Sequence, residues 1–248
     1  MAKKLFDANL FPSPKKLTSG DKFVLNKWGS SIETVRIDFV WHNGWIDCDM
    51  CAFMLGEDGM IHKVVDLVYF NSRLRWKTDK PFDIEDFDPQ YYISKGEFST
   101  WAKEEKKGAF RNRLRWEEST FPVSADGSVI GPLDDIDCEG CCSETMFVRL
   151  YEVNTHKYAS IVFAAAIPKN NADAGVRFKD TCICTVNIYD ANTDELLAEY
   201  KLDQSINEKD VVRFGRIIYD EDNDLWSFDP MAIGDTGGLM YLATEVYN

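Results

Sequence analysis

Apolar and polar residues alternate along many short stretches of the chain, a pattern that is typical of half-buried β-strands. Turn signals such as Glu57-Asp58-Gly59 and Ala191-Asn192-Thr193-Asp194 separate these stretches. Eight to ten strands at this spacing predict an all-β fold, a sandwich of two antiparallel sheets. The expected strands lie at 34–41, 45–55, 61–70, 146–153, 158–167, 181–189, 195–202, 211–219, 225–233 and 238–246.

One segment, residues 73–122, interrupts this pattern with a mixture of basic, acidic and aromatic residues. Within it, residues 96–110 are predicted to form a short helix that Ser99 begins and Gly108 ends. A structureless loop of about 50 residues would be unusual in a compact domain. We therefore expect a partly helical insertion that lies on the sandwich.

The charge of the chain narrows its range of partners. The sequence has 42 acidic and 28 basic residues, a formal net charge of −14. Such a surface repels phosphate backbones and anionic lipids, so nucleic acid and membranes are disfavoured, whereas cations are attracted. There is neither a signal-peptide-like apolar run nor a stretch of about 20 apolar residues. We expect a cytoplasmic protein with no transmembrane segment.

The cysteines suggest two kinds of chemistry, and the sequence supports neither strongly. Their odd number, seven, and the missing secretion signal predict reduced thiols. The pairs Cys48/Cys51 and Cys138/Cys141 have zinc-ligand spacing, but strand periodicity places Cys48 and Cys51 on opposite faces. Cys182 and Cys184 share a face, and we expect both to be buried as small apolar side chains.

Two groups of carboxylates are the strongest candidates for a functional site. Asp47 and Asp49 share one face of a predicted strand. A second group crowds an acidic loop, and no Lys or Arg lies between Asp126 and Arg149 to compensate its charge. Calcium takes six to eight oxygen ligands and would fit both groups, although solvated polar surfaces are the alternative. The acidic loop contains Asp134, Asp135, Asp137, Glu139 and Glu144.

Other motifs argue against an enzyme. The run Asp220–Asp224 begins like an EF-hand loop, but Leu225 and Met231 stand where a glycine and a glutamate are needed, so a hairpin turn is expected. The three histidines lack a neighbouring nucleophile motif, and no phosphate-binding or dinucleotide-binding glycine motif occurs. We predict no catalytic activity.

Several stretches, in their order and spacing, resemble the TerD family, the tellurium-resistance and stress-response domain. The resemblance covers the chain except an N-terminal extension, residues 1–16, and the insertion, so a single domain over 1–248 is expected. It implies a β-sandwich, calcium binding by loop carboxylates, and a role in bacterial or phage-related stress responses. The matching stretches are 17–27, 46–55, 65–71, 124–131, 161–167, 197–202 and 226–242.

The resemblance also implies particular ligands. Asp47 and Asp49 match the paired aspartates of the family's F-D-L-D strand. Asp66 and Asn71 match its D-F-V-F-Y-N segment. These four residues are therefore expected among the calcium ligands.

In the acidic loop the chain departs from the family. Asp134 matches the aspartate of G-D-N and Glu144 the last acid of G-D-D-E, but Cys141-Cys142-Ser143 replaces the preceding residues. Because calcium prefers oxygen to sulfur, the site is expected to be weaker, to hold one ion, or to be lost, unless other loop carboxylates compensate. The predicted ligands are Asp47, Asp49, Asp66, Asn71, Asp134, Asp135, Asp137, Glu139 and Glu144.

The sequence thus predicts a calcium-binding stress-response protein that acts through cation-ordered loops and protein partners in a stress or defence complex. The alternative is a cation-independent interaction scaffold that uses the insertion, where Arg-Leu-Arg-Trp occurs at 73–76 and 113–116. Arginine and tryptophan are enriched in protein-binding hot spots.

Overall fold

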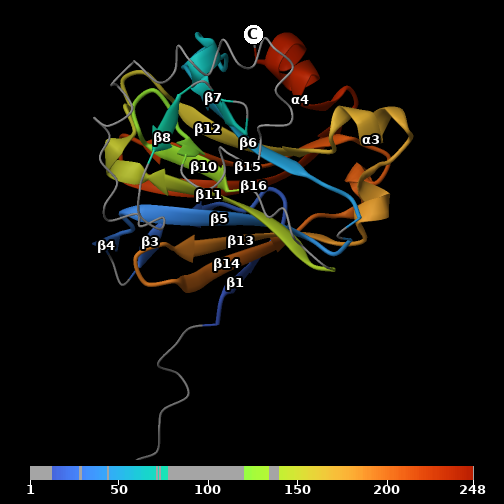
Figure 1. Cartoon of the computed structure of the whole chain (residues 1–248). Helices are drawn as coiled ribbons and strands as arrows, with labels where there is room; N and C mark the ends of the chain where they lie inside the picture. The colour runs from blue at the N-terminus through green and yellow to red at the C-terminus, as the bar shows by residue number, and fades with distance from the viewer. Residues whose placement is uncertain are drawn as a thin grey trace, which may run out of the picture.

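Two six-stranded sheets packed face to face form the body of the protein (Figure 1), which confirms the predicted all-β sandwich. In the ranges described below, no helix is long and apolar enough to cross a membrane. The computed structural model describes residues 13–27, 30–43, 45–70, 72, 74–77, 120–133 and 140–247.

Sheet A is the lower layer in Figure 1, and its strands pair antiparallel except β1 with β14. Its central strand β5 shows the predicted alternation, because Ile37 and Phe39 are fully buried while Arg36 and Asp38 between them are not. In spatial order the strands are β1 (Lys15–Leu17), β14 (Glu195–Lys201), β13 (Cys184–Asp190), β5 (Thr34–Trp41), β11 (Cys142–Arg149) and β10 (Val129–Leu133).

Sheet B is the upper layer, and it is entirely antiparallel. The predicted turn at Asp220–Asp224 is confirmed as the connection between its strands β15 and β16. In spatial order the strands are β2 (Phe23–Val24), β16 (Leu225–Asp235), β15 (Val211–Asp220), β12 (Ser160–Ala166), β6 (Asp49–Leu55) and β7 (Leu67–Tyr69).

Short elements complete the described chain. A two-residue ribbon pairs β3 with β4, and a second ribbon pairs β8 with β9. The elements are β3 (Asn26–Lys27), β4 (Ser30–Ser31), β8 (Arg75–Lys77), β9 (Thr120–Pro122), α3 (Lys169–Asp173), α4 (Gly238–Tyr241), the π-helical turn η7 (Leu242–Val246), and the 3₁₀ turns η1 (Val64–Asp66), η4 (Leu150–Glu152), η5 (Phe178–Thr181) and η6 (Gln204–Ile206).

Strand β6 of sheet B is buried on both faces. All seven residues of β6 are buried, which is why this strand is a nearly continuous apolar run in the sequence. Met50 and Met54 pack between the sheets in the main core, whereas Cys51 and Phe53 face the outside of sheet B. The outer face around β6 is covered by the C-terminal segment, which lies above sheet B in Figure 1.

That C-terminal segment corrects the sequence prediction, because residues 238–246 are helical and not a strand. Asp210 accepts hydrogen bonds from the amides of Gly237 and Gly238, both 2.9 Å long, at positive φ angles of 119° and 66°. A distant carboxylate thus holds the first turn of the helix. Apolar residues recur every three or four positions, a helical period that the short run concealed: Leu239, Leu242, Ala243 and Val246.

The insertion begins and ends in one ribbon. β8 and β9 pair antiparallel, and Lys77 lies opposite Thr120. The predicted helix at 96–110 and the second Arg-Leu-Arg-Trp string at 113–116 lie outside the described residues. The two ends of the insertion therefore lie side by side.

Asp210→Ala should lower the free energy of unfolding by about 1–3 kcal/mol, because the two part-buried amides of Gly237 and Gly238 lose their carboxylate acceptor. Urea denaturation measures this. Asp222→Ala, an exposed residue of the β15–β16 turn, should change stability by no more than about 0.5 kcal/mol. Equal effects of the two substitutions would show that Asp210 does not anchor α4.

Candidate functional site

Three of the predicted ligands lie near one end of the sandwich, where the chain passes from β5 into β6. Asp47 is half-buried in this connection, and Asp49 is the first residue of β6, with 8% of its surface exposed. Glu144, the third residue of β11, is 1% exposed. It faces inward because Cys142 and Met146, two positions away on either side, belong to the main core. We call this region the Glu144 end.

Glu144 links the two sheets at this end. The pairing of β6 with β7 stops at Cys51 and Tyr69. The next backbone amide of β6, that of Met50, donates its hydrogen bond to Oε2 of Glu144. A side chain of sheet A therefore satisfies a backbone donor of sheet B at the point where the pairing of β6 with β7 ends.

Two buried thiols, Cys48 and Cys51, lie in the same part of the chain as the two aspartates. Burial raises the pKa of Cys48, and the charges of Asp47, Glu144 and Asp49 raise it further. Burial also raises the pKa of Cys51, again with contributions from Glu144 and Asp49. Both thiols therefore stay protonated at neutral pH. Cys48 packs in the main core and Cys51 on the outside of sheet B, so the two thiols face in opposite directions, as the strand periodicity predicted.

The remaining predicted ligands of this region lie outside the described residues. Strand β10 ends at Leu133, which is opposite Thr145, the neighbour of Glu144, and the described chain resumes at Gly140. The acidic loop is therefore attached beside Glu144. The ligands that lie outside the described residues are Asn71, Asp134, Asp135, Asp137 and Glu139.

The donor chemistry of the Glu144 end fits calcium. Asp47, Asp49 and Glu144 offer only oxygen atoms, as calcium prefers. Among the described residues, however, no group of three or more His, Cys, Asp or Glu side chains is placed to hold a metal ion. A full coordination shell would need ligands from the parts of the chain that are not described, so the calcium site stays a prediction.

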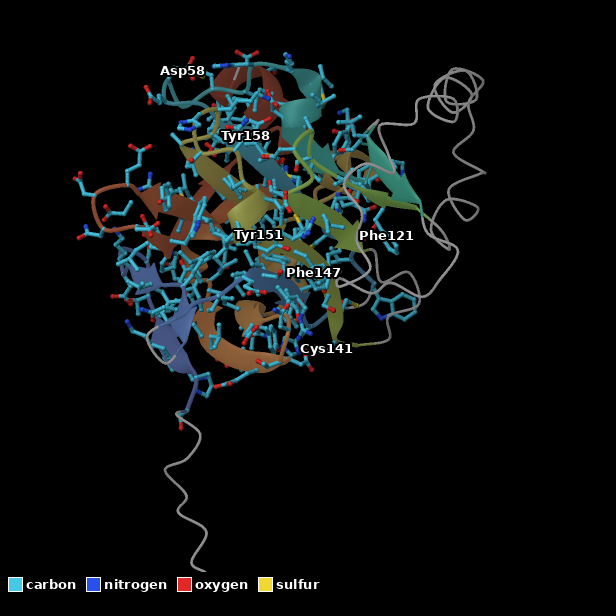
Figure 2. All side chains as sticks on the ribbon, turned by 90° about the vertical axis from the view of Figure 1, so that its left-hand side faces the viewer. Asp58, Phe121, Cys141, Phe147, Tyr151 and Tyr158 are labelled. Carbon is cyan, nitrogen blue, oxygen red and sulfur yellow. The ribbon has the colours of Figure 1, made fainter. Side chains whose placement is uncertain are left out.

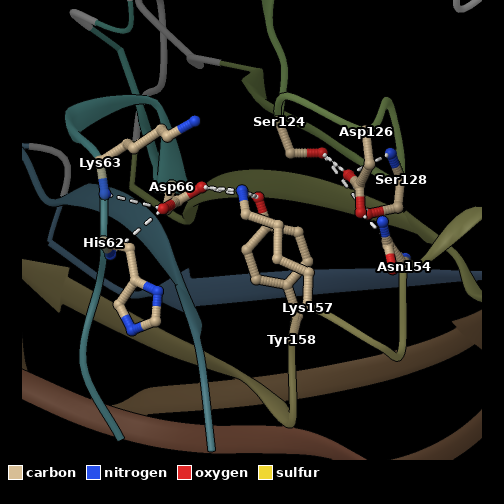
Figure 3. Close-up of polar contacts among 9 residues, drawn as sticks. All are labelled: His62, Lys63, Asp66, Ser124, Asp126, Ser128, Asn154, Lys157 and Tyr158. Carbon is tan, nitrogen blue, oxygen red and sulfur yellow. Dashed lines mark hydrogen bonds and ion pairs between the residues drawn. The ribbon is translucent and has the colours of Figure 1, made fainter. Parts of the chain in front are cut away.

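The fourth described ligand, Asp66, lies in a different environment (Figure 3). Its carboxylate is 1% exposed and accepts four hydrogen bonds from protein groups. Oδ1 accepts from the Tyr158 hydroxyl at 2.6 Å and from Nζ of Lys157 at 2.8 Å. Oδ2 accepts from the backbone amides of Lys63 at 2.8 Å and His62 at 3.2 Å. The protein itself therefore solvates this carboxylate completely.

Lys157 supplies the compensating charge at Asp66. Burial alone would raise the pKa of Asp66, but the hydrogen bonds from Lys157 and Tyr158 and the Lys157 charge outweigh it, so the pKa lies below its usual value. Burial and the Asp66 carboxylate raise the pKa of Tyr158. The Lys157 ammonium also donates to the Tyr158 hydroxyl and lies 4.2 Å from the centre of its ring.

The pairing register of β6 with β7 places Asp66 far from the Glu144 end. Leu67 pairs with Phe53, so Asp66 lies level with Met54, five residues along β6 from Asp49. At the rise of a β-strand this is about 17 Å. Calcium–oxygen distances are roughly 2.4 Å, so Asp66 and Asp49 cannot bind the same ion. The structure therefore does not bring the predicted ligands together as one set.

A second aspartate orders the same region as Asp66. Oδ1 of Asp126 accepts hydrogen bonds from the hydroxyls of Ser124 and Ser128, and Oδ2 accepts from the amide of Asn154 at 3.1 Å. Asp66 and Asp126 together hold the segments 62–66, 124–128 and 154–158 (Figure 3). Asp126 and Lys157 were not predicted from the sequence.

The cysteines correct two predictions. Cys142 is disulfide-bonded, so the prediction of reduced thiols is wrong at this position. An odd total of cysteines does not exclude a single disulfide bond. Cys182 is exposed at a positive φ of 67°, since β13 begins only at the buried Cys184. Cys141 is an exposed free thiol beside sheet A, well away from Tyr158 (Figure 2).

The fold and these carboxylates define a class of protein, a two-sheet β-sandwich with acidic groups concentrated at the ends of its strands. The family model described as the TerD domain matches residues 14–78 and 121–246. The chain belongs to the TerD family. The match is interrupted where β8 and β9 enclose the insertion.

Two solved structures share the fold. The protein SAV2460, of unknown function, is 16% identical with a TM-score of 0.51, over 86% of this chain and 95% of that chain. A homologue of the telluride resistance protein TerD, SCO6318 from Streptomyces coelicolor A3(2), is 14% identical with a TM-score of 0.51, over 87% and 97%. A comparison with curated proteins gives no match.

The Asp66 carboxylate predicts a pH dependence of stability. Because its pKa is lower in the folded state, its contribution is present above the unfolded value of about 4 and is lost as the pH falls through the folded pKa. Asp66→Asn should cost about 2–3 kcal/mol at pH 7, less than for a fully buried pair because Lys157 is 33% exposed. Urea denaturation from pH 7 to pH 2 should show a smaller acid dependence in the variant. Parallel curves would contradict the assigned shift.

Proposed function

We propose that this protein binds calcium at the Glu144 end and acts in the cytoplasm as a tellurium-resistance-like stress-response protein, without catalysis. Membership of the TerD family supports the functional class. The observation that supports the cation most directly is Glu144, a carboxylate that is 1% exposed and lies next to Thr145, which pairs with Leu133 where the acidic loop begins.

In the proposed mechanism, Asp47, Asp49 and Glu144 would hold the ion, together with ligands from Asn71 and the acidic loop. Bound calcium supplies the positive charge that offsets their mutual repulsion. Glu144 also holds the start of strand β6, because its carboxylate accepts the hydrogen bond of the Met50 amide. Ordering these segments would create the surface that a protein partner in a stress complex recognises.

Calcium at about 1,000 times its dissociation constant should stabilise the wild-type protein by roughly 4 kcal/mol, if it binds only the folded state. Calorimetric titration and melting curves in calcium and in chelator measure this. Glu144→Gln should weaken binding at least about tenfold, about 1.4 kcal/mol, because the amide oxygen can still accept the Met50 hydrogen bond but the charge is gone.

Glu57→Gln is the matched control, since Glu57 is exposed in the turn after β6, and it should leave calcium binding unchanged. Melting curves of the wild type that are identical in calcium and in chelator would sink the calcium proposal.

A second candidate function is a cation-independent scaffold that binds a partner through the insertion. It is favoured by Asp66, where Lys157 provides the charge that a metal ion would otherwise provide. It is also favoured by the family match, which omits residues 79–120. On this hypothesis the sandwich only presents the insertion.

Replacing residues 78–119 with Asn-Gly tests this candidate. Because Lys77 pairs with Thr120, a two-residue turn can close the β8–β9 ribbon. We expect the shortened protein to keep its fold and its calcium response, with a melting temperature within about 5 °C of the wild type. Retained binding to a partner identified with the full chain would rule out the insertion as the interface.

A further inference from the structure

The carboxylate of Asp66 has a permanent counter-ion within the chain. We propose that Lys157 acts as a built-in cation at Asp66, so that this end of the sandwich is ordered without metal and Asp66 is not a calcium ligand. The inference does not depend on calcium binding at the Glu144 end, because the two regions lie about 17 Å apart along β6.

The hydrogen-bond geometry at Asp66 leaves no site for a metal ion. A carboxylate has about four acceptor positions, and four protein donors occupy those of Asp66 at 2.6 to 3.2 Å. Two of these donors are backbone amides, which cannot move without unwinding the chain before η1. A calcium ion would have to displace both Lys157 and Tyr158 from Oδ1.

The charge balance at Asp66 is equally complete. The ammonium group of Lys157 neutralises the carboxylate at 2.8 Å. The face of the Tyr158 ring, 4.2 Å away, further stabilises the ammonium group. A divalent cation beside this pair would be repelled by the lysine unless the lysine moved into solvent.

The contact also has a structural consequence. Lys157 and Asp66 are 91 residues apart in the sequence, and their pair ties the connection between β6 and β7 to the loop before β12. A tethered ammonium group is present at every calcium concentration. This end of the sandwich is therefore held in one conformation, whereas the Glu144 end can respond to the cation.

Lys157→Met tests the proposal, because it removes the charge and keeps most of the side-chain volume. The variant should melt on the order of 10 °C lower in chelator. It should gain a weak calcium site, with a dissociation constant of about 10⁻⁴–10⁻³ M, and ten times that concentration should restore roughly 3–6 °C beyond the response of the wild type.

Terbium provides a local readout, because it binds at calcium sites and emits when a neighbouring tyrosine is excited. Tyr158 adjoins Asp66, so Lys157→Met should show additional tyrosine-sensitised emission. Lys157→Arg keeps the positive charge and should show none. The double variant Asp66→Asn/Lys157→Met lacks the carboxylate and should also show none.

Two results would overturn the proposal. One is the absence of any Asp66-dependent calcium or terbium response in Lys157→Met. The other comes from Asp66→Asn in the otherwise unchanged protein, which should leave the number of bound calcium ions as in the wild type. Loss of an ion in that variant would identify Asp66 as a ligand. That measurement remains informative even if Lys157→Met folds poorly.

Discussion

A carboxylate that leaves water needs either a positive charge or a full set of hydrogen-bond donors, and this requirement governs both ends of the sandwich. At Asp66 the chain meets it with Lys157, Tyr158 and two backbone amides. At the other end, Glu144 is equally buried and accepts a hydrogen bond from the Met50 amide. The two carboxylates therefore illustrate two ways to keep an acid inside a protein, one by an internal lysine and one, as proposed, by calcium.

The strand β6 determines where these groups lie. Its residues are buried on both faces, so it needs the opposing sheet on one side and the C-terminal helix on the other. Asp49 lies at its first residue, and Asp66 lies level with Met54 near its last. One buried strand thus keeps the Glu144 end and the lysine-held end apart.

Local patterns predicted most of the sandwich and part of the candidate site. The strand at 34–41 was predicted with its observed limits, because alternation and flanking polar residues are local signals. The segment 238–246 was predicted to be a strand but is helical, because its apolar run is short. The Asp210 carboxylate that holds its first turn is distant in the sequence and gives no local signal. The partner of Asp66 is 91 residues away, so no local pattern around Asp66 contains the lysine. Register, which sequence alternation does not specify, separates Asp66 from Asp49.

An anomalous difference map from crystals grown with calcium or terbium tests the central claim most directly. The account predicts an ion within about 2.6 Å of oxygen atoms of Asp49 and Glu144, with the Lys157–Asp66 pair intact and no ion beside it. An ion bound to Asp66, or crystals that contain no ion at the Glu144 end, would contradict it.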